Sequence, residues 1–151
     1  EMNRHLALDV LDTGRFMTLF YMAIDPPNEQ LQWVRAGHDP AMLYDPKQNT
    51  FEELGGTGIA LGVKDDFRYE TYQKTGLADG QIVAIGTDGI WEACNPSGEM
   101  FGKKRFQDVI RHYAREDANN ILGAVYDKLD HFTRGLKSED AITSVVAKVQ
   151  N

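Results

Sequence analysis

The sequence predicts an α+β domain in which helices pack on antiparallel β-sheet. Short runs of strand-like composition fill the first half of the chain, and two amphipathic helical segments follow them. A last apolar run at 141–149 returns to strand-like sequence. Because a sheet with an apolar face and a helix with an apolar stripe bury each other, this order of elements favours that class.

Turn residues bound each strand expected in the first half. Residues 16–24 form an apolar, aromatic-rich run, and 31–35 resume strand-like sequence after the turn at 25–29, which predicts a hairpin. Further strands are expected at 41–44, 50–54 and 67–72, the last from its alternation of residue types. Before the hairpin, residues 3–11 have the pattern of a helix end, with a stop signal at 12–14.

Hydrophobic residues recur at helical spacing in the C-terminal third. The first predicted helix begins near Lys103, and its apolar face consists of Phe106, Val109, Ile110 and Tyr113. The second has Asp117 as its N-cap, and its apolar face consists of Ile121, Leu122, Val125, Leu129 and Phe132.

Composition limits the classes of protein to which the chain can belong. A length of 151 residues with 42% hydrophobic content suits one domain spanning residues 1–151. The formal charge of -7, without a basic block, argues against a nucleic-acid partner. Cys94 is the only cysteine, so an intrachain disulfide and a cysteine-based zinc site are excluded. No run reaches the roughly 20 apolar residues of a membrane span, so we expect a cytoplasmic protein or the cytoplasmic part of a larger one.

Several segments contain glycines or histidines that could indicate a phosphate-binding loop, a metal site or an acid–base site. The glycines at 55–62 fail the dinucleotide-binding spacing, and 98–104 fail the P-loop pattern, so both stretches are interpreted as turns that need positive φ. His38 lies in a tight loop between two expected strands, and a structural role is favoured about four to one, since turn residues explain the loop. His112 and His131 lie off the apolar faces, and His5 carries no motif.

Two acidic residues stand at the ends of expected strands. Asp88 follows the apolar run 81–86 and precedes Gly89, and Asp140 comes directly before the run 141–149. Alone, Asp88 could be a hairpin turn acid, since Asp-Gly is a frequent hairpin pair. Together, two strands that each carry an aspartate at one end could bring carboxylates around a hard cation.

An ordered set of motifs then gives a more specific identification. The segments are 16–20, 36–40, 61–63, 87–93, 101–102 and 140–143. In that order they resemble the metal-dependent serine/threonine phosphatases of the PPM (type 2C) family, above all the bacterial branch of the stage II sporulation and sigma-factor regulator phosphatases. The resemblance covers essentially the whole chain.

The resemblance implies two stacked antiparallel sheets flanked by helices, with a binuclear Mn²⁺ or Mg²⁺ centre. Asp88 and Asp140 would be metal ligands. Glu92 occupies the place of an acid that helps some members to bind a third metal, although a surface role is the better interpretation. If 90–94 were helical, Asp88 and Glu92 would share one face. The expected reaction is hydrolysis of phosphoserine or phosphothreonine by a metal-activated water.

Two departures from the family pattern qualify this expectation. No Gly-Asp-x-x-Asp type motif occurs before Phe16, which indicates a fragment lacking its N-terminal strands and first metal motif, or a degenerate relative. The presence of both Asp88 and Asp140 favours the fragment. The smaller departure is Ala141, where this branch usually has a second acid.

The expected substrate is a phosphorylated regulatory protein of the anti-anti-sigma type. In this branch the catalytic domain usually follows a sensory or receiver domain, so a larger parent protein is expected. The alternative is a catalytically inactive phosphatase-like module that binds and sequesters a regulatory partner. A third interpretation, an α+β domain of unknown role, would gain support if Asp88 and Asp140 lay far apart.

Overall fold

The computed structural model describes residues 3–6, 14–136 and 140–150, and its residues form two compact units. The first unit comprises Glu1–Pro40 with Leu54–Leu77, and the second comprises Ala41–Glu53 with Ala78–Asn151. Among the described residues, no helix combines the length and apolar content needed to cross a membrane.

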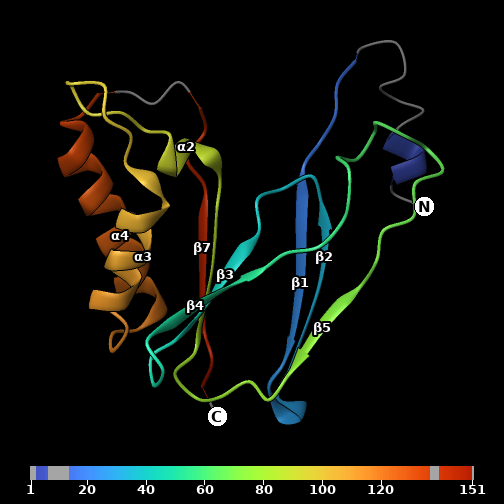
Figure 1. Cartoon of the computed structure of the whole chain (residues 1–151), viewed down its shortest axis with the longest axis horizontal. Helices are drawn as coiled ribbons and strands as arrows, with labels where there is room; N and C mark the ends of the chain where they lie inside the picture. The colour runs from blue at the N-terminus through green and yellow to red at the C-terminus, as the bar shows by residue number, and fades with distance from the viewer. Residues whose placement is uncertain (1–2, 7–13, 137–139, 151) are drawn as a thin grey trace. The chain divides into compact units, whose positions relative to one another are not determined.

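The first unit contains a three-stranded antiparallel sheet in the order β1-β2-β5 (Figure 1). Strands β1 (Leu19–Asp25) and β2 (Gln30–Ala36) pair from Leu19 opposite Ala36 to Asp25 opposite Gln30. A 3₁₀ turn, η1 (Pro26–Asn28), joins them, as expected from two prolines that favour a turn and cannot continue a ladder. The predicted hairpin is therefore confirmed.

The strand predicted at 67–72 is wrong. Strand β5 is Tyr72–Thr75, and it pairs with β2 only from Trp33 opposite Tyr72 to Gln30 opposite Thr75. Beyond Trp33, the glycine-rich segment approaches β2 instead: the indole of Trp33 donates to the Gly55 carbonyl at 2.7 Å. The alternation of residue types at 67–72 could not show that the segment around Gly55 occupies the place beside this part of β2.

Close packing of the backbone against β2 explains one glycine of the stretch 55–62. Gly56 and Gly62 have positive φ, as predicted for turns. Gly58 does not, but a Cβ built on it would lie 2.1 Å from the carbonyl oxygen of Arg35. Its role is to let two backbone segments come together, a function of glycine distinct from turn formation.

The predicted N-terminal helix can be followed over residues 3–6, which are helical; residues 7–13 lie outside the described residues. Asn3 is buried, with 8% of its surface exposed, and fixes the loop that follows Leu61. Its side-chain oxygen accepts from the Gly62 amide at 3.0 Å, and its amide donates to the Lys64 carbonyl at 2.8 Å.

The second unit contains a four-stranded antiparallel sheet in the order β4-β3-β6-β7. Its strands are β3 (Ala41–Asp45), β4 (Thr50–Leu54), β6 (Ile82–Gly86) and β7 (Ser144–Lys148). The expected strands at 41–44 and 50–54 are confirmed, and the final strand is shorter than the predicted 141–149. Its two central strands, β3 and β6, are nearly all buried, and β6 has an unbroken apolar sequence.

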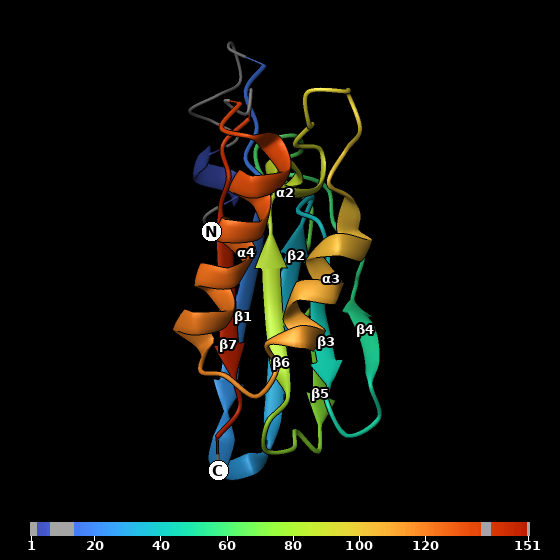
Figure 2. The same ribbon diagram turned by 90° about the vertical axis from the view of Figure 1, so that its left-hand side faces the viewer.

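Helices α3 (Gly102–His112) and α4 (Ala118–Thr133) lie over this sheet (Figure 2). Of the two predicted apolar faces, all residues but Tyr113 and Leu122 lie in the core or pack against it. Asp117 caps α4 by accepting from the Asn120 amide at 2.8 Å. Tyr113 is an exception to the prediction. It follows the last residue of α3 and is 39% exposed, because the chain leaves helical geometry there.

Asp45 joins the end of β3 to the start of β6. Its Oδ1 accepts from the Lys47 amide at 2.8 Å, and its Oδ2 accepts from the Gln81 side chain at 3.1 Å. Burial raises the pKa of this carboxyl, but hydrogen bonds from the Gln48 amide, Gln81 and Lys47 outweigh burial and hold the pKa below its usual 3.8. The carboxylate form therefore stabilises the fold.

Candidate metal centre

Asp88 is the first residue of a one-turn helix, α2 (Asp88–Trp91), which begins where β6 ends. The hairpin interpretation of Asp88 is therefore excluded. Ile90 and Trp91 are buried, and the Trp91 ring lies 6.1 Å from that of Phe106. Gly86 leaves room for them, since a Cβ there would lie 2.8 Å from the Trp91 ring. The apolar anchors hold α2 in the core and leave the Asp88 carboxylate exposed.

Thr87 ties this turn to the segment that carries Asp140. Its hydroxyl donates to the Ala141 carbonyl at 2.9 Å and accepts from the Thr143 amide at 3.1 Å. Its own amide donates to the Thr143 carbonyl at 3.0 Å. The two segments are thus joined although they are 54 residues apart in sequence.

The strand ladder explains why the two segments meet. Strands β6 and β7 are antiparallel neighbours, with Gly86 opposite Ser144. The carboxyl end of β6 and the amino end of β7 therefore lie at the same edge of the sheet. Gly89 is packed so closely there that a Cβ on it would lie 2.7 Å from the Ala141 carbonyl oxygen. Asp88 and Asp140 thus belong to segments that are in contact. The interpretation as an α+β domain of unknown role required these segments to lie far apart, so it gains no support.

Residues 90–94 do not form a helix, so the condition for Asp88 and Glu92 to share one helix face is not met. Helix α2 ends at Trp91, and Glu92 caps it by donating its amide to the Asp88 carbonyl at 2.8 Å. The helix is limited to one turn because Ala93 returns to the core and its carbonyl bonds to the Phe101 amide at 2.8 Å. The Glu92 side chain is exposed.

The chemistry of the donors fits Mn²⁺ or Mg²⁺ in part. Carboxylate oxygens suit these hard cations, and Asp88 and Asp140 are both exposed. Among the described residues, however, no group of three or more His, Cys, Asp or Glu side chains is placed to hold a metal ion. The two aspartates can therefore supply only part of a ligand set.

The histidines occupy other places. His38 is half-buried in the loop after β2, where its Nδ1 lies 2.9 Å from the Asp39 carbonyl and its own carbonyl accepts from Arg35. His112 and His131 are exposed, as predicted. Sequence reasoning missed Thr87, whose only signal was a hydroxyl residue immediately before the acid at a strand end.

Comparison with known proteins shows the family. The chain matches Stage II sporulation protein E (SpoIIE) over residues 1–150. The chain belongs to the SpoIIE family. The predicted kinship with the sporulation and sigma-regulator branch of the PPM phosphatases is thus confirmed.

Individual relatives agree with this assignment. Phosphoserine phosphatase RsbU of Bacillus subtilis (strain 168) is 28% identical over 129 residues, which cover 85% of this chain and 38% of RsbU. The SiaA-PP2C domain of Pseudomonas aeruginosa has a similar structure, with a TM-score of 0.83 and 22% identity over 98% of this chain and 58% of that one. The Mn-presoaked phosphatase domain of SpoIIE from Bacillus subtilis gives a TM-score of 0.67 at 17% identity, covering 100% of this chain and 73% of that one.

The likeness to these solved structures concerns the fold. Two antiparallel sheets with helices match PP2C domains, so the predicted fold class is confirmed. The SpoIIE-family chain spans 38% of RsbU and 58% of the SiaA-PP2C chain.

Proposed function

We propose that this chain is part of the catalytic domain of a protein serine/threonine phosphatase. The observation that carries the proposal is the junction of the two acid-bearing segments through Thr87, with the Ala141 carbonyl 2.9 Å from its hydroxyl. The names of RsbU and of the PP2C domains support the same class of activity. A structure of the SpoIIE phosphatase domain presoaked with Mn supports a divalent cation.

In this proposal Asp88 and Asp140 hold a binuclear Mn²⁺ or Mg²⁺ centre at the edge formed by β6 and β7. When bound, the cations would activate a water for attack on phosphorus. The chain's own residues orient the ligands: α2 presents the Asp88 carboxylate to solvent, and Thr87 fixes the backbone beside Asp140. Glu92 is a further ligand candidate within the same proposal.

The remaining ligands must come from other residues, because two carboxylates do not complete such a site. We propose that a Gly-Asp-x-x-Asp type motif in the parent protein supplies them, and that the parent also carries a sensory or receiver domain. The short share of RsbU that the chain covers supports a longer parent.

The proposed substrate is phosphoserine or phosphothreonine on a regulatory protein of the anti-anti-sigma type. The kinship with RsbU, a phosphoserine phosphatase, supports this class. The proposal includes a cytoplasmic location, since sigma factors act where transcription takes place.

The direct test is phosphate release from a phosphorylated anti-anti-sigma-type protein by the intact parent with Mn²⁺. Asp88→Asn should abolish release, whereas Asp130→Asn, at an exposed position on α4, should leave it unchanged. Calorimetry with Mn²⁺ should show binding that the Asp88 variant loses. Full turnover by the Asp88 variant would contradict the mechanism. Tight partner binding without turnover would favour the sequestering module instead.

A further inference from the structure

The first turn of α3 carries a concentrated group of positive charge. Lys103, Lys104 and Arg105 are consecutive, and nowhere else in the sequence are two lysine or arginine residues adjacent. Residues 99–111 carry four cations and two carboxylates, a net charge of +2, whereas the whole chain has a net charge of -7. The group is shorter than the basic blocks of roughly five or six residues that are typical of nucleic-acid-binding tails. It is a local exception on an acidic protein.

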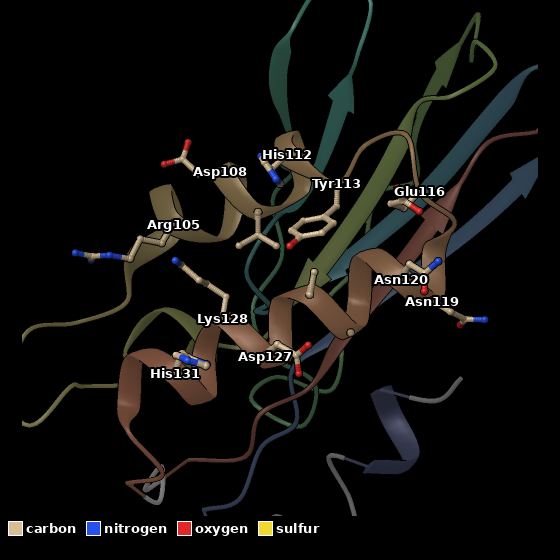
Figure 3. Close-up of a pocket in the computed structure, with 13 residues that line it drawn as sticks. Arg105, Asp108, His112, Tyr113, Glu116, Asn119, Asn120, Asp127, Lys128 and His131 are labelled. Atoms are coloured by element: carbon tan, nitrogen blue, oxygen red, sulfur yellow. The ribbon is translucent and has the colours of Figure 1, made fainter.

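The two lysines are not placed to stabilise the helix. Lys103 and Lys104 are the second and third residues of α3, which begins at Gly102, and the amino end of a helix carries a partial positive charge. Lys128 and His131 differ because they lie toward the carboxyl end of α4, where the helix dipole favours cations (Figure 3). Helix stability thus accounts for the cations of α4 but not for the lysines of α3. A departure from local preference of this kind is typical of functional positions.

Arg105, the third member of the group, has a structural role. Its guanidinium donates to the Met100 carbonyl at 3.0 Å and the Phe101 carbonyl at 2.9 Å, and it forms an ion pair with Glu99. It also lies 4.8 Å from the ring of Phe132 on α4. Arg105 therefore fixes the segment that enters α3, and its charge is balanced by Glu99.

Lys104 has an accessible ammonium group. Its side chain is 85% exposed, and it forms an ion pair with Asp108 at 2.9 Å. Asp108 also pairs with Arg111 at 2.6 Å, so one carboxylate is shared by two cations. Exposed ion pairs contribute little to stability. Lys104 can therefore exchange Asp108 for the carboxylate of a ligand at little cost.

Lys103 connects the basic turn to the candidate metal centre. Its ammonium lies 4.9 Å from the centre of the Trp91 ring, and Trp91 is the last residue of the one-turn helix that begins at Asp88. Figure 2 shows α2 and the loop that enters α3 at the same end of the second unit. The two lysines thus lie beside the edge of the sheet at which the segments of Asp88 and Asp140 meet.

We propose that Lys103 and Lys104 bind acidic side chains that flank the phosphorylated residue of the protein substrate. The inference rests on the proposed function, because it requires a phosphoprotein to be bound at the β6–β7 edge. The sign of the charge selects the occupant: an acidic segment matches the basic turn, whereas the acidic remainder of the chain repels it. The lysines would therefore determine which phosphorylated segments dock beside the centre.

Substrate kinetics of the intact parent protein test this proposal. The probes are a phosphoserine peptide flanked by glutamates, the same peptide flanked by glutamines, and p-nitrophenyl phosphate, which has no flanking residues. Lys103→Gln combined with Lys104→Gln should raise the KM of the glutamate peptide about tenfold and leave kcat unchanged. The KM values of the other two probes should change by less than about twofold, because neither carries the acidic flanks.

Two control variants separate charge at this turn from charge elsewhere. Lys47→Gln with Arg115→Gln makes the same change of charge at exposed positions that follow the carboxyl ends of β3 and α3, and it should have no effect. Lys103→Arg with Lys104→Arg should retain the preference for the glutamate peptide. Lys103→Glu with Lys104→Glu should reverse it, so that a lysine-flanked phosphopeptide binds about tenfold better than to the parent protein.

Peptide binding, measured by fluorescence anisotropy, separates docking from catalysis. A preference in Kd that the glutamine variant loses, without phosphate release, would support docking and contradict the proposed phosphatase activity. Phosphate release with equal KM and Kd values for the glutamate and glutamine peptides would overturn docking and leave the activity supported. Absence of peptide binding, or an equal loss on p-nitrophenyl phosphate in the glutamine variant, would also overturn docking. Far-UV circular dichroism checks that each variant is folded.

Discussion

Replacing Thr87 by valine should separate the segments of the candidate metal centre while keeping the size of the side chain. The substitution removes a hydroxyl that donates to the Ala141 carbonyl at 2.9 Å and accepts from the Thr143 amide at 3.1 Å. Two hydrogen bonds at roughly 0.5–1.5 kcal/mol each give a loss of about 1–3 kcal/mol. Because this site is partly exposed, water will replace some of that energy, and the lower half of the range applies.

Equilibrium denaturation of the intact protein measures this loss directly. A decrease of about 1–2 kcal/mol should lower the melting temperature by roughly 2–8 °C for a domain of this size. If the junction orients Asp140 toward the cation, Mn²⁺ binding should weaken by up to about tenfold, the equivalent of 1.4 kcal/mol.

Thr87→Ser is the matched control, because it keeps the hydroxyl and loses only a methyl group. Its Mn²⁺ affinity should stay within about twofold of the parent protein. Equal stability and equal Mn²⁺ binding in the valine and serine variants would show that the hydroxyl does not join the two segments.

Three further changes probe the second unit. Gly89→Ala should weaken Mn²⁺ binding and lower stability, since its Cβ would lie 2.7 Å from the Ala141 carbonyl oxygen. Calorimetry measures the Mn²⁺ binding. Asp117→Ala removes the α4 N-cap and should cost about 1 kcal/mol in urea unfolding. Asp45→Asn should lower the free energy of unfolding at neutral pH. Because the folded pKa of Asp45 lies below 3.8, this deficit should shrink as the pH falls below that value.

Each of these changes has its own control. Gly123→Ala lies on an open helix face and should be neutral or stabilising, so equal damage there would contradict the clash at 89. Asp117→Asn should retain most of the cap, and a full loss would show that charge rather than hydrogen bonding matters. A pH-independent deficit in Asp45→Asn would contradict a titrating carboxylate as its cause.

The sequence predicted those elements whose structure depends on local pattern. The 25–29 turn lies between two apolar runs, and the N-cap of α4 precedes a regular helical stripe, so both were predictable. The strand expected at 67–72 failed because alternation does not reveal which neighbour a strand has, and the Gly55 segment approaches β2 instead.

The candidate site was predictable only in part. The position of Asp88 near the end of a strand could be deduced from the long apolar run before it, whereas Asp140 lies in the segment that leads into β7, because that strand begins only at Ser144. Their meeting depends on the β6–β7 register and on the Thr87 hydroxyl, which are contacts between distant residues. The one-turn length of α2 also depends on packing of Trp91 in the core, so Glu92 could not be placed from spacing.

The second unit has two parts whose sequences can vary independently: the β6–β7 junction, and the outer surface of α3 and α4, which lie between these strands in the sequence. Both acid-bearing segments are positioned by one strand ladder, while α3 and α4 form an excursion between its two strands. Insertions or substitutions on the outer surface of that excursion can accumulate without moving Asp88 relative to Asp140. The outer surface of the helical hairpin can therefore vary while the same edge of the sheet still brings together the segments that carry Asp88 and Asp140.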